Sequence, residues 1–392
     1  MRFPEFTEEW ETKKLGEVAT NKSEKYNPAN ETDFIKCIEM EHLITDTGQL
    51  LGYIDGSTSG SIKNVFNEGD VLFGKLRPYL KKYLQAPFDG VCSSEIWVLK
   101  GKNISNDFLY RIVQTKLFID LANQSSGSKM PRADWNVVES GSFSIPTPLE
   151  QKKISSFLAL LDERIQTQNK IIEQLETLIK GLSEKIFSQK IRFKEFTDEW
   201  KVKSLGEMGN TFNGLSGKTK EDFGKGIPYI QYKQIFDSAK VQIKKCGLVE
   251  IAQNENQNSV KYGDIFFTIS SETPDEIGMS SVLLDEVNEM YLNSFCFGYR
   301  PFSLQVLNPL FASYLFRSSV FRNEIVKLAQ GSTRYNMSKI GLMKLTISLP
   351  SSKEQITIAR FLSSIDQKLQ TEKNILDKYQ SKKQFLLQNL FI

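Results

Sequence analysis

The chain repeats itself, and this repeat limits the possible folds more than any other feature of the sequence. Residues 2–17 read RFPEFTEEWETKKLGE and residues 192–207 read RFKEFTDEWKVKSLGE, with eleven of the sixteen positions identical. Agreement of this extent indicates a duplication. The 392 residues are also too many for one ordinary domain, so we expect two similar domains in tandem.

The two copies match at their ends and differ in their middles. Three further blocks correspond: 69–73 with 263–267, 127–128 with 331–332, and 150–162 with 354–366. The offset grows from 190 residues at the start to 204 at the close, so the second copy holds 14 more residues. The similar ends predict that both copies are attached in the same way. The divergent middles predict that each copy recognises something different.

Each copy closes on the heptad pattern of a coiled-coil helix. Apolar residues recur at alternating steps of four and three over 154–186, where only Gln168 interrupts them. The register returns over 358–390, where Glu372 and Lys383 stand on the seam. A pattern of about 37 residues predicts a helix roughly 55 Å long. Both helices therefore require a partner.

Each apolar seam can be buried in two ways. An antiparallel pair within the chain is the simplest, and it would bring Gln168 and Glu372 close together near mid-helix. Pairing between two chains stays open, because isoleucine and leucine on separate edges also suit parallel dimers. Lys383 weakens the expectation of pairing near the C-terminal half of the second helix.

The middles carry short strand-like runs followed by amphipathic helical stretches. The runs are 71–73, 96–99, 265–269 and 345–349, and the helical stretches are near 107–122 and 309–329. We expect an α+β fold with two tandem mixed α/β recognition domains, each followed by a long helix. The predicted parts are 1–148 and 191–350 for the domains, and 149–190 and 351–392 for the spacer helices.

The formal charge of +3 does not by itself indicate nucleic-acid binding, but local clusters do. Directly after a predicted strand, residues 74–83 hold four cations and two tyrosines. Such a loop can bind phosphates and leave an arginine for a guanine edge. A solvated loop is the equally weighted alternative. The candidate DNA-binding residues here are Lys75, Arg77, Lys81 and Lys82.

A second cluster occurs in both copies, which favours a function for it over a solvated loop. Glycine, hydroxyl and arginine or asparagine side chains make a loop whose donors can reach base edges. The candidates are Ser128, Lys129 and Arg132 in the first copy and Ser332, Arg334, Tyr335 and Asn336 in the second. The run 218–233 is a weaker candidate without a basic counterpart, and contributes Lys218, Lys220 and Lys233.

The catalytic motifs that we considered do not fit the chain. The segment GLSGKT at 214–219 ends like a phosphate loop, but two residues separate its glycines where four are required. His42 is the only histidine and the four cysteines are widely spaced, which excludes a zinc site. Neither a nuclease Glu-x-Lys after Asp275 nor an adenine-methylation box is present. We therefore expect a binding subunit without catalytic or metal-ligating residues.

These features together resemble the specificity subunits of type I restriction–modification systems. The resemblance covers essentially the whole chain and is carried by residues 10–16 and 200–206, the Gly-Ser loops, and the helix starts at 146–151 and 350–355. It implies that each domain reads one half of a split double-stranded DNA site. It also implies that the two helices pack antiparallel and set the gap between the half-sites.

The resemblance also implies partners. Two modification subunits would bring S-adenosylmethionine and methylate adenine, and two restriction subunits would bring ATP and magnesium, so this chain would bind no cofactor itself. The N-terminus lacks a signal-peptide pattern and no segment is apolar enough to span a membrane, so we expect a cytoplasmic protein. The alternatives are a coiled-coil scaffold with two protein-binding domains and a DNA enzyme that acts alone.

Overall fold

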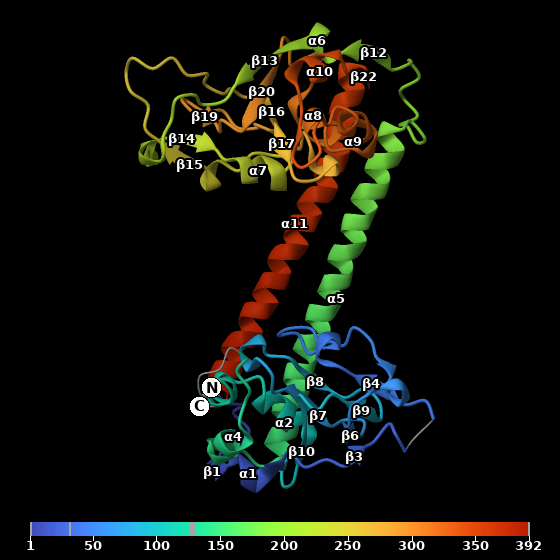
Figure 1. Ribbon diagram of the computed structural model, residues 1–392, viewed down its shortest axis with the longest axis vertical. Coiled ribbons are helices and arrows are strands. Elements are labelled where there is room, and N and C mark those ends of the chain that lie inside the picture. The colour runs from blue at the N-terminus through green and yellow to red at the C-terminus, as the bar shows by residue number, and fades with distance from the viewer. Residues whose placement is uncertain (1, 31–32, 125–129, 391–392) are drawn as a thin grey trace. The chain divides into compact units, whose positions relative to one another are not determined.

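The structure is a computed structural model that describes residues 2–30, 33–124 and 130–390. It divides into two compact units (Figure 1). Unit 1 holds Met1–Lys170 and Lys373–Ile392, and unit 2 holds Ile171–Glu372. Each unit therefore contains one globular domain, the first part of the long helix that follows this domain, and the last part of the other long helix.

Unit 1 is built on an antiparallel sheet, a second mixed sheet and a small two-stranded ladder. The first sheet, in spatial order, is β2 (Ala19–Thr20), β10 (Ile96–Gly101), β7 (Val71–Gly74) and β8 (Tyr83–Gln85). The mixed sheet is β3 (Lys25–Tyr26), β6 (Lys63–Phe66), β9 (Gly90–Cys92), β4 (Lys36–Ile38) and β5 (Ile54–Asp55), with β4 and β9 parallel. The ladder is β1 (Glu11–Lys14) with β11 (Ser142–Ile145).

Unit 2 repeats this plan with changes in the second sheet. The antiparallel sheet is β13 (Gly209–Asn213), β20 (Cys296–Pro301), β16 (Ile265–Thr268) and β18 (Ser280–Val282). The second sheet is β15 (Gly247–Val249), β14 (Phe223–Ile230) and β19 (Tyr291–Leu292). The ladder is β12 (Lys201–Ser204) with β22 (Thr346–Leu349), and a short extra pair is β17 (Ser270–Ser271) with β21 (Tyr335–Asn336). The predicted mixed α/β class is confirmed in both units.

Short helices cover these sheets. In unit 1 they are α1 (Leu15–Val18), α2 (Asn106–Ile112), α3 (Lys116–Ala122) and α4 (Trp135–Ser140). In unit 2 they are α6 (Leu205–Met208), α7 (Tyr232–Asp237), α8 (Pro309–Leu315), α9 (Ser319–Val326) and α10 (Lys339–Lys344).

The predicted helical stretches near 107–122 and 309–329 are helical in the structure, and each consists of two short helices. The hydroxyl of Thr115 accepts from the backbone N–H of Phe118, and that of Ser318 from the backbone N–H of Phe321. Both hydroxyl residues have an extended backbone, so each restarts a new helix as its N-cap.

The repeated Gly-Asp pair builds the turn before the central strand of each unit. Gly69 and Gly263 adopt φ values of +84° and +87°, which only glycine reaches without strain. The carboxylate of Asp70 accepts from the backbone N–H of Asn67, and that of Asp264 accepts from the backbone N–H of Lys261, each at 2.8 Å. The conserved pattern between the copies at this point is therefore a structural requirement of the turn.

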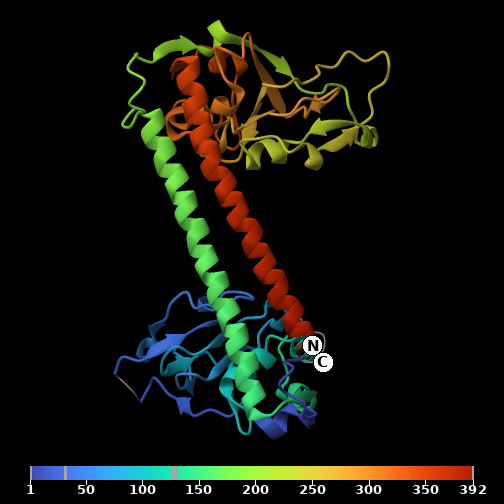
Figure 2. The ribbon, with the colours of Figure 1, turned by 180° about the vertical axis from the view of Figure 1, so that it is seen from behind.

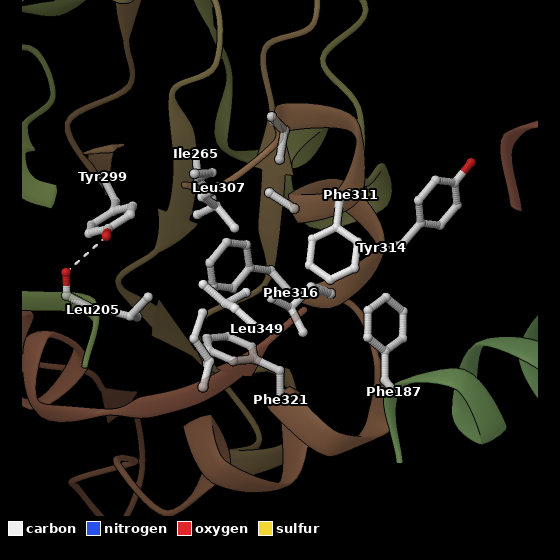
Figure 3. Packing of buried hydrophobic residues seen from close by; sticks show 14 of the residues in the cluster. Phe187, Leu205, Ile265, Tyr299, Leu307, Phe311, Tyr314, Phe316, Phe321 and Leu349 are labelled. Atoms are coloured by element: carbon white, nitrogen blue, oxygen red, sulfur yellow. Dashed lines mark hydrogen bonds between the residues drawn. The ribbon is translucent and has the colours of Figure 1, made fainter. Parts of the chain in front are cut away.

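The core of unit 2 is rich in phenylalanine and reaches the end of a long helix. Phe316 and Phe321 meet edge to face with ring centroids 4.7 Å apart. In Figure 3, Phe187 from the end of α5 (Pro148–Phe187) points toward Phe311, and their centroids are 5.5 Å apart. Tyr299 donates to the backbone carbonyl of Leu205 at 2.8 Å. The helix end is thus part of the domain core.

Within each unit, the first part of one long helix lies beside the last part of the other. In unit 1, two leucines near the end of the chain join the buried cluster that contains Ile154 and Leu158 of α5. They are Leu386 of α11 (Ser352–Asn389) and Leu390, the residue directly after this helix. In unit 2, Ile186 of α5 joins the cluster of Ile358 and Leu362 of α11, and Figure 2 shows both helices from behind. Gln168 and Glu372 fall in different units, so their expected meeting stays a prediction.

Candidate nucleic-acid interface

The repeated N-terminal motif ties each domain to the start of its long helix. In unit 1 the Arg2 guanidinium donates from Nε and Nη2 to the two oxygens of Glu150 at 2.8 and 2.7 Å. The indole N–H of Trp10 donates to the same carboxylate at 3.0 Å. These hydrogen bonds raise the pKa of Arg2, so the guanidinium stays charged. We call this arrangement the latch.

Unit 2 has the same latch in the same geometry. Arg192 donates from Nε and Nη2 to Glu354, both at 2.7 Å, and the Trp200 indole N–H donates to Glu354 at 3.3 Å. The Glu354 side chain is 1% exposed, so this carboxylate depends on its partners for the hydrogen bonds that water would otherwise supply. The matched ends of the two copies therefore form the same attachment in each unit.

The next residue of the helix start also has the same task in both units. Gln151 accepts from the backbone N–H of Ser105 and donates to the carbonyl of Pro146. Gln355 accepts from the backbone N–H of Asn308 and donates to the carbonyl of Pro350. The repeated glutamine of the Glu-Gln pair thus holds the residue just before α2 in unit 1 and just before α8 in unit 2.

An aspartate about three turns further along each helix completes the attachment. Asp162 of α5 accepts from Arg111 of α2 and pairs with Lys383 of α11 at 2.7 Å. Asp366 of α11 pairs with Lys240 at 3.0 Å and accepts from the Tyr314 hydroxyl. Lys383 is therefore compatible with helix pairing in unit 1, because Asp162 neutralises the charge that interrupts the apolar seam.

This pairing predicts a measurable coupling. In a double-mutant cycle of Lys383→Met and Asp162→Asn, we expect a coupling energy of about 0.5–3 kcal/mol, as for contacting charged residues that are mostly buried. Urea unfolding of the four proteins measures it. The same cycle with the exposed neighbour Lys382→Met is the control and should couple by less than about 0.5 kcal/mol. Equal coupling for both lysines would mean that the seam contact contributes nothing.

The basic loop after β7 lies against the Gly-Ser loop of the same unit. The backbone N–H of Arg77 donates to the carbonyl of Pro131 at 2.8 Å, and that of Ala133 to the carbonyl of Lys75 at 2.8 Å. Leu76 and Arg132 form a β-bridge. The structure therefore brings together two clusters that are about 50 residues apart in the sequence.

Two residues of this basic loop have a left-handed backbone. Arg77 has φ +53° and Lys81 has φ +48°, a conformation that is unfavourable for residues with a long side chain. Arg77 is exposed, whereas Lys81 pairs with Asp46 at 3.1 Å and Lys82 donates to the carbonyl of Met40 at 2.6 Å. The strained backbone thus presents Arg77 to solvent while the two lysines are held by neighbours.

The remaining candidates of unit 1 differ in how they are held. The Nε of Arg132 donates to both carboxylate oxygens of Glu95, at 3.0 and 3.2 Å, and the arginine side chain remains 51% exposed. Lys75 is half-buried. Ser128 and Lys129 lie outside the described residues.

Unit 2 presents its Gly-Ser loop in the same way. Tyr335 and Asn336 form β21 and pair with Ser271 and Ser270 of β17. Ser332, Arg334 and Asn336 are exposed, and Tyr335 is half-buried. The loop and the segment after the central strand therefore converge in both units.

The three lysines from the weaker run do not come together as one site. Lys218 has a side chain that is only 5% exposed and pairs with Glu255. Lys233 is exposed and pairs with Asp237 one helical turn away at 2.9 Å. Lys220 is exposed at the start of a short 3-10 helix. Because its ammonium group is buried and paired, Lys218 is less accessible than Lys220 and Lys233, and its contact with DNA stays a prediction.

An amide-rich cleft in unit 2 was missed by the sequence reasoning. The cleft has a volume of about 410 Å³. Its polar lining residues are Asn213, Ser216, Asn256, Gln257, Asn258 and Ser294. Lys339 donates to Asn213 at its edge. The run of amides at 253–258 was visible in the sequence, but such a composition is also typical of an ordinary loop.

Residues 2–30, 33–124 and 130–390 are the ones whose structure is described. Among those residues no group of three or more His, Cys, Asp or Glu side chains is placed to hold a metal ion. None of the helices within those ranges is long and apolar enough to cross a membrane.

Comparison with known proteins identifies the family to which the chain belongs. The domain described as "Type I restriction modification DNA specificity domain" matches residues 7–177 and 197–379. The MjaVIII specificity subunit of a type I restriction enzyme from Methanocaldococcus jannaschii is 26% identical over 364 residues, which cover 89% of this chain and 80% of that protein. The EcoDI specificity subunit from Escherichia coli is 28% identical over 208 residues, covering 51% of this chain and 45% of that protein.

Solved structures show the same fold. A chain from a study of the assembly and conformational transition of the type I restriction–modification system superimposes with a TM-score of 0.64 at 20% identity, covering 97% of this chain and 96% of that one. The S subunit from M. genitalium superimposes with a TM-score of 0.58 at 15% identity, covering 98% and 96%.

Proposed function

Because the chain belongs to the family of type I restriction–modification DNA specificity domains and is a DNA-recognition subunit, we propose that each of its units reads one half of a split, asymmetric DNA site. The surface proposed for unit 1 centres on Arg77 and Arg132, with Lys75, Lys81 and Lys82 near the DNA backbone. The surface proposed for unit 2 centres on Arg334 and Asn336.

One observation carries this proposal. The two units attach their domains through the same latch, yet they place different side chains on the two converging loops. Unit 1 has Arg77 and Arg132 where unit 2 has Ser271 and Asn336, according to the backbone pairing of these loops. Identical fastening with different exposed chemistry is what two different half-sites require, because base edges are distinguished by the donors and acceptors that meet them.

The long helices are proposed to pair as an antiparallel coiled coil that sets the gap between half-sites. In support, α5 has 40 residues and α11 has 38, so each reaches roughly 55–60 Å at 1.5 Å per residue. The contacts at both ends have antiparallel order, since Asp162 meets Lys383 in unit 1 and Ile186 packs near Ile358 in unit 2.

Catalysis is proposed to belong to partners. Two modification subunits would dock on the repeated latch and helix regions, bring S-adenosylmethionine and methylate adenine. Two restriction subunits would join with ATP and magnesium, all in the cytoplasm where the DNA lies. Two equivalent docking places on one chain follow from its internal duplication.

The test is methylation by the assembled complex. The chain is purified with its modification subunits, and single-molecule sequencing of the treated DNA identifies the methylated adenines. We expect a split, asymmetric site and an affinity for DNA that falls steeply with salt. Methylation of a continuous site would contradict the proposal. Absence of any salt-dependent DNA affinity would favour a coiled-coil scaffold instead.

Single-residue variants separate binding from folding. We expect Arg77→Ala and Arg334→Ala each to weaken DNA binding by the assembled complex by roughly 5- to 150-fold, because each side chain is exposed and able to contact DNA. Thermal unfolding of both variants should stay close to that of the unchanged protein.

Lys218→Ala is the matched control for these variants. It removes a cation of unit 2, but one whose side chain is buried and paired with Glu255. We expect it to lower thermal stability and to leave DNA affinity unchanged. The reverse pattern, with Lys218→Ala weakening binding and Arg77→Ala only unfolding the chain, would show that the surface is placed wrongly.

A further inference from the structure

The two units can be aligned position by position through their backbone hydrogen bonds. The N–H of Lys75 donates to the carbonyl of Glu95 at 2.9 Å, and the N–H of Ile269 donates to the carbonyl of Phe295 at 3.1 Å. One residue further on, Leu76 bridges Arg132 and Ser270 pairs with Asn336.

This alignment makes Arg132 and Asn336 equivalent. Each stands on the Gly-Ser loop of its unit, opposite the residue that follows the central strand, and each is exposed. The two units therefore place different side chains at the same backbone-paired position.

In unit 1 the scaffold presents guanidinium groups. Glu95 accepts only from the Nε of Arg132, so within the described residues neither Nη group of Arg132 has a hydrogen-bond partner. Arg77 lies beside it and is held outward by its left-handed backbone. The carboxylate of Glu95 orients this guanidinium and leaves both of its Nη groups available as donors. Such a group can form two parallel hydrogen bonds to a planar pair of acceptors.

In unit 2 the equivalent position presents an amide, and the exposed Arg334 stands two residues before it. Asn336 replaces the arginine, and the loop after β17 carries Glu272, Asp275 and Glu276 where unit 1 carries its basic residues. The amide-rich cleft that Asn213 lines lies in the same unit. Ile269, the residue before Ser270, also lines this cleft. At the position that Arg132 holds in unit 1, unit 2 therefore offers an amide, whose donor and acceptor differ from the guanidinium fork.

We propose that Arg132 reads a guanine in one half-site and that Asn336 reads an adenine at the corresponding place of the other half-site. Arginine donates to both O6 and N7 of guanine, whereas an asparagine amide pairs with N6 and N7 of adenine. This inference rests on the proposed function and adds to it the identity of one base in each half-site.

The experiment exchanges the two side chains within the assembled complex. Complexes of the chain with its modification subunits are made with Arg132→Asn and with Asn336→Arg, and each is given DNA in which both half-sites are randomised. Sequencing of the methylated molecules then reports the preferred base at every position. Thermal unfolding of the free chain checks that both variants fold.

We expect Arg132→Asn to lower the preference for guanine at one position of one half-site by roughly 5- to 150-fold and to leave the other half-site unchanged. Asn336→Arg should do the same for adenine in the other half-site. Arg132→Lys is the matched control, because it keeps the charge but loses the planar fork. It should reduce the guanine preference while overall affinity changes little.

Two outcomes would overturn the inference while the proposed function stands. In the first, the site is split but Arg132→Asn weakens methylation equally for all bases, which is the behaviour of a phosphate contact. In the second, Arg132→Lys retains the full guanine preference. If the unchanged complex methylates no split site, the proposed function fails and the inference fails with it.

Discussion

Replacement of residues 18–148 by the corresponding segment of another member of this family is expected to change one half of the methylated DNA sequence completely and to leave the other half as it was. The reason is structural, since the latch, the Glu-Gln pair and the aspartate of α5 lie outside the exchanged segment or at its border. Arg2, Trp10, Glu150, Gln151 and Asp162 would all be retained. Sequencing of methylated adenines measures the outcome.

The reciprocal exchange of residues 208–350 serves as the internal control. It retains Arg192, Trp200 and Glu354 and should change the opposite half-site only. The number of base pairs between the half-sites should stay constant in both exchanges, because the long helices are untouched. A change in both half-sites, or in neither, would show that the two units do not read DNA independently.

The largest effect on stability is expected from Trp200→Ala, which should destabilise unit 2 by about 3–5 kcal/mol. Trp200 is 9% exposed and borders a cavity of about 120 Å³ that Ile186, Ile358 and Glu354 also line. Its removal enlarges this cavity and leaves the Glu354 carboxylate with one donor fewer. Urea unfolding followed by circular dichroism measures the loss.

Trp200→Phe separates packing from hydrogen bonding at the same position. It keeps most of the ring but loses the indole N–H that donates to a buried charged group, so we expect a loss of about 1.5–3 kcal/mol. Trp10→Phe makes the equivalent change in unit 1. If Trp200→Phe proved as stable as the unchanged protein, the latch of unit 2 would depend on packing and the Arg192 pair alone.

The latch explains why the middles of the copies are free to differ. Each domain is attached by its first and last segments, through Arg2 with Glu150 or Arg192 with Glu354, and by the Glu-Gln pair that holds α2 or α8. None of these contacts uses the loops that carry Arg77, Arg132 or Asn336. A loop can therefore gain or lose residues, as the 14 additional residues of the second copy illustrate, without loss of attachment.

Periodicity and repetition in the sequence alone determined the duplication, the mixed fold of the domains and the two long helices, and a resemblance of motifs indicated the family. The comparisons and the structure confirm these points. Such features are local or self-similar, so they can be read without knowing which distant segments meet. The sequence places the two helix starts at residues 149 and 351, where proline marks the boundary, and in the structure α5 begins at Pro148 and α11 at Ser352.

Only the tertiary structure decided which side chains meet across the chain. The partner of Glu150 is Arg2 and that of Asp162 is Lys383, at separations of 148 and 221 residues, and no local pattern indicates either pair. The same holds for Lys218. The sequence suggests a lysine that is free to bind DNA, but in the structure its ammonium group pairs with Glu255. Packing brings these groups together from different elements, so their roles depend on neighbours that spacing along the chain does not encode.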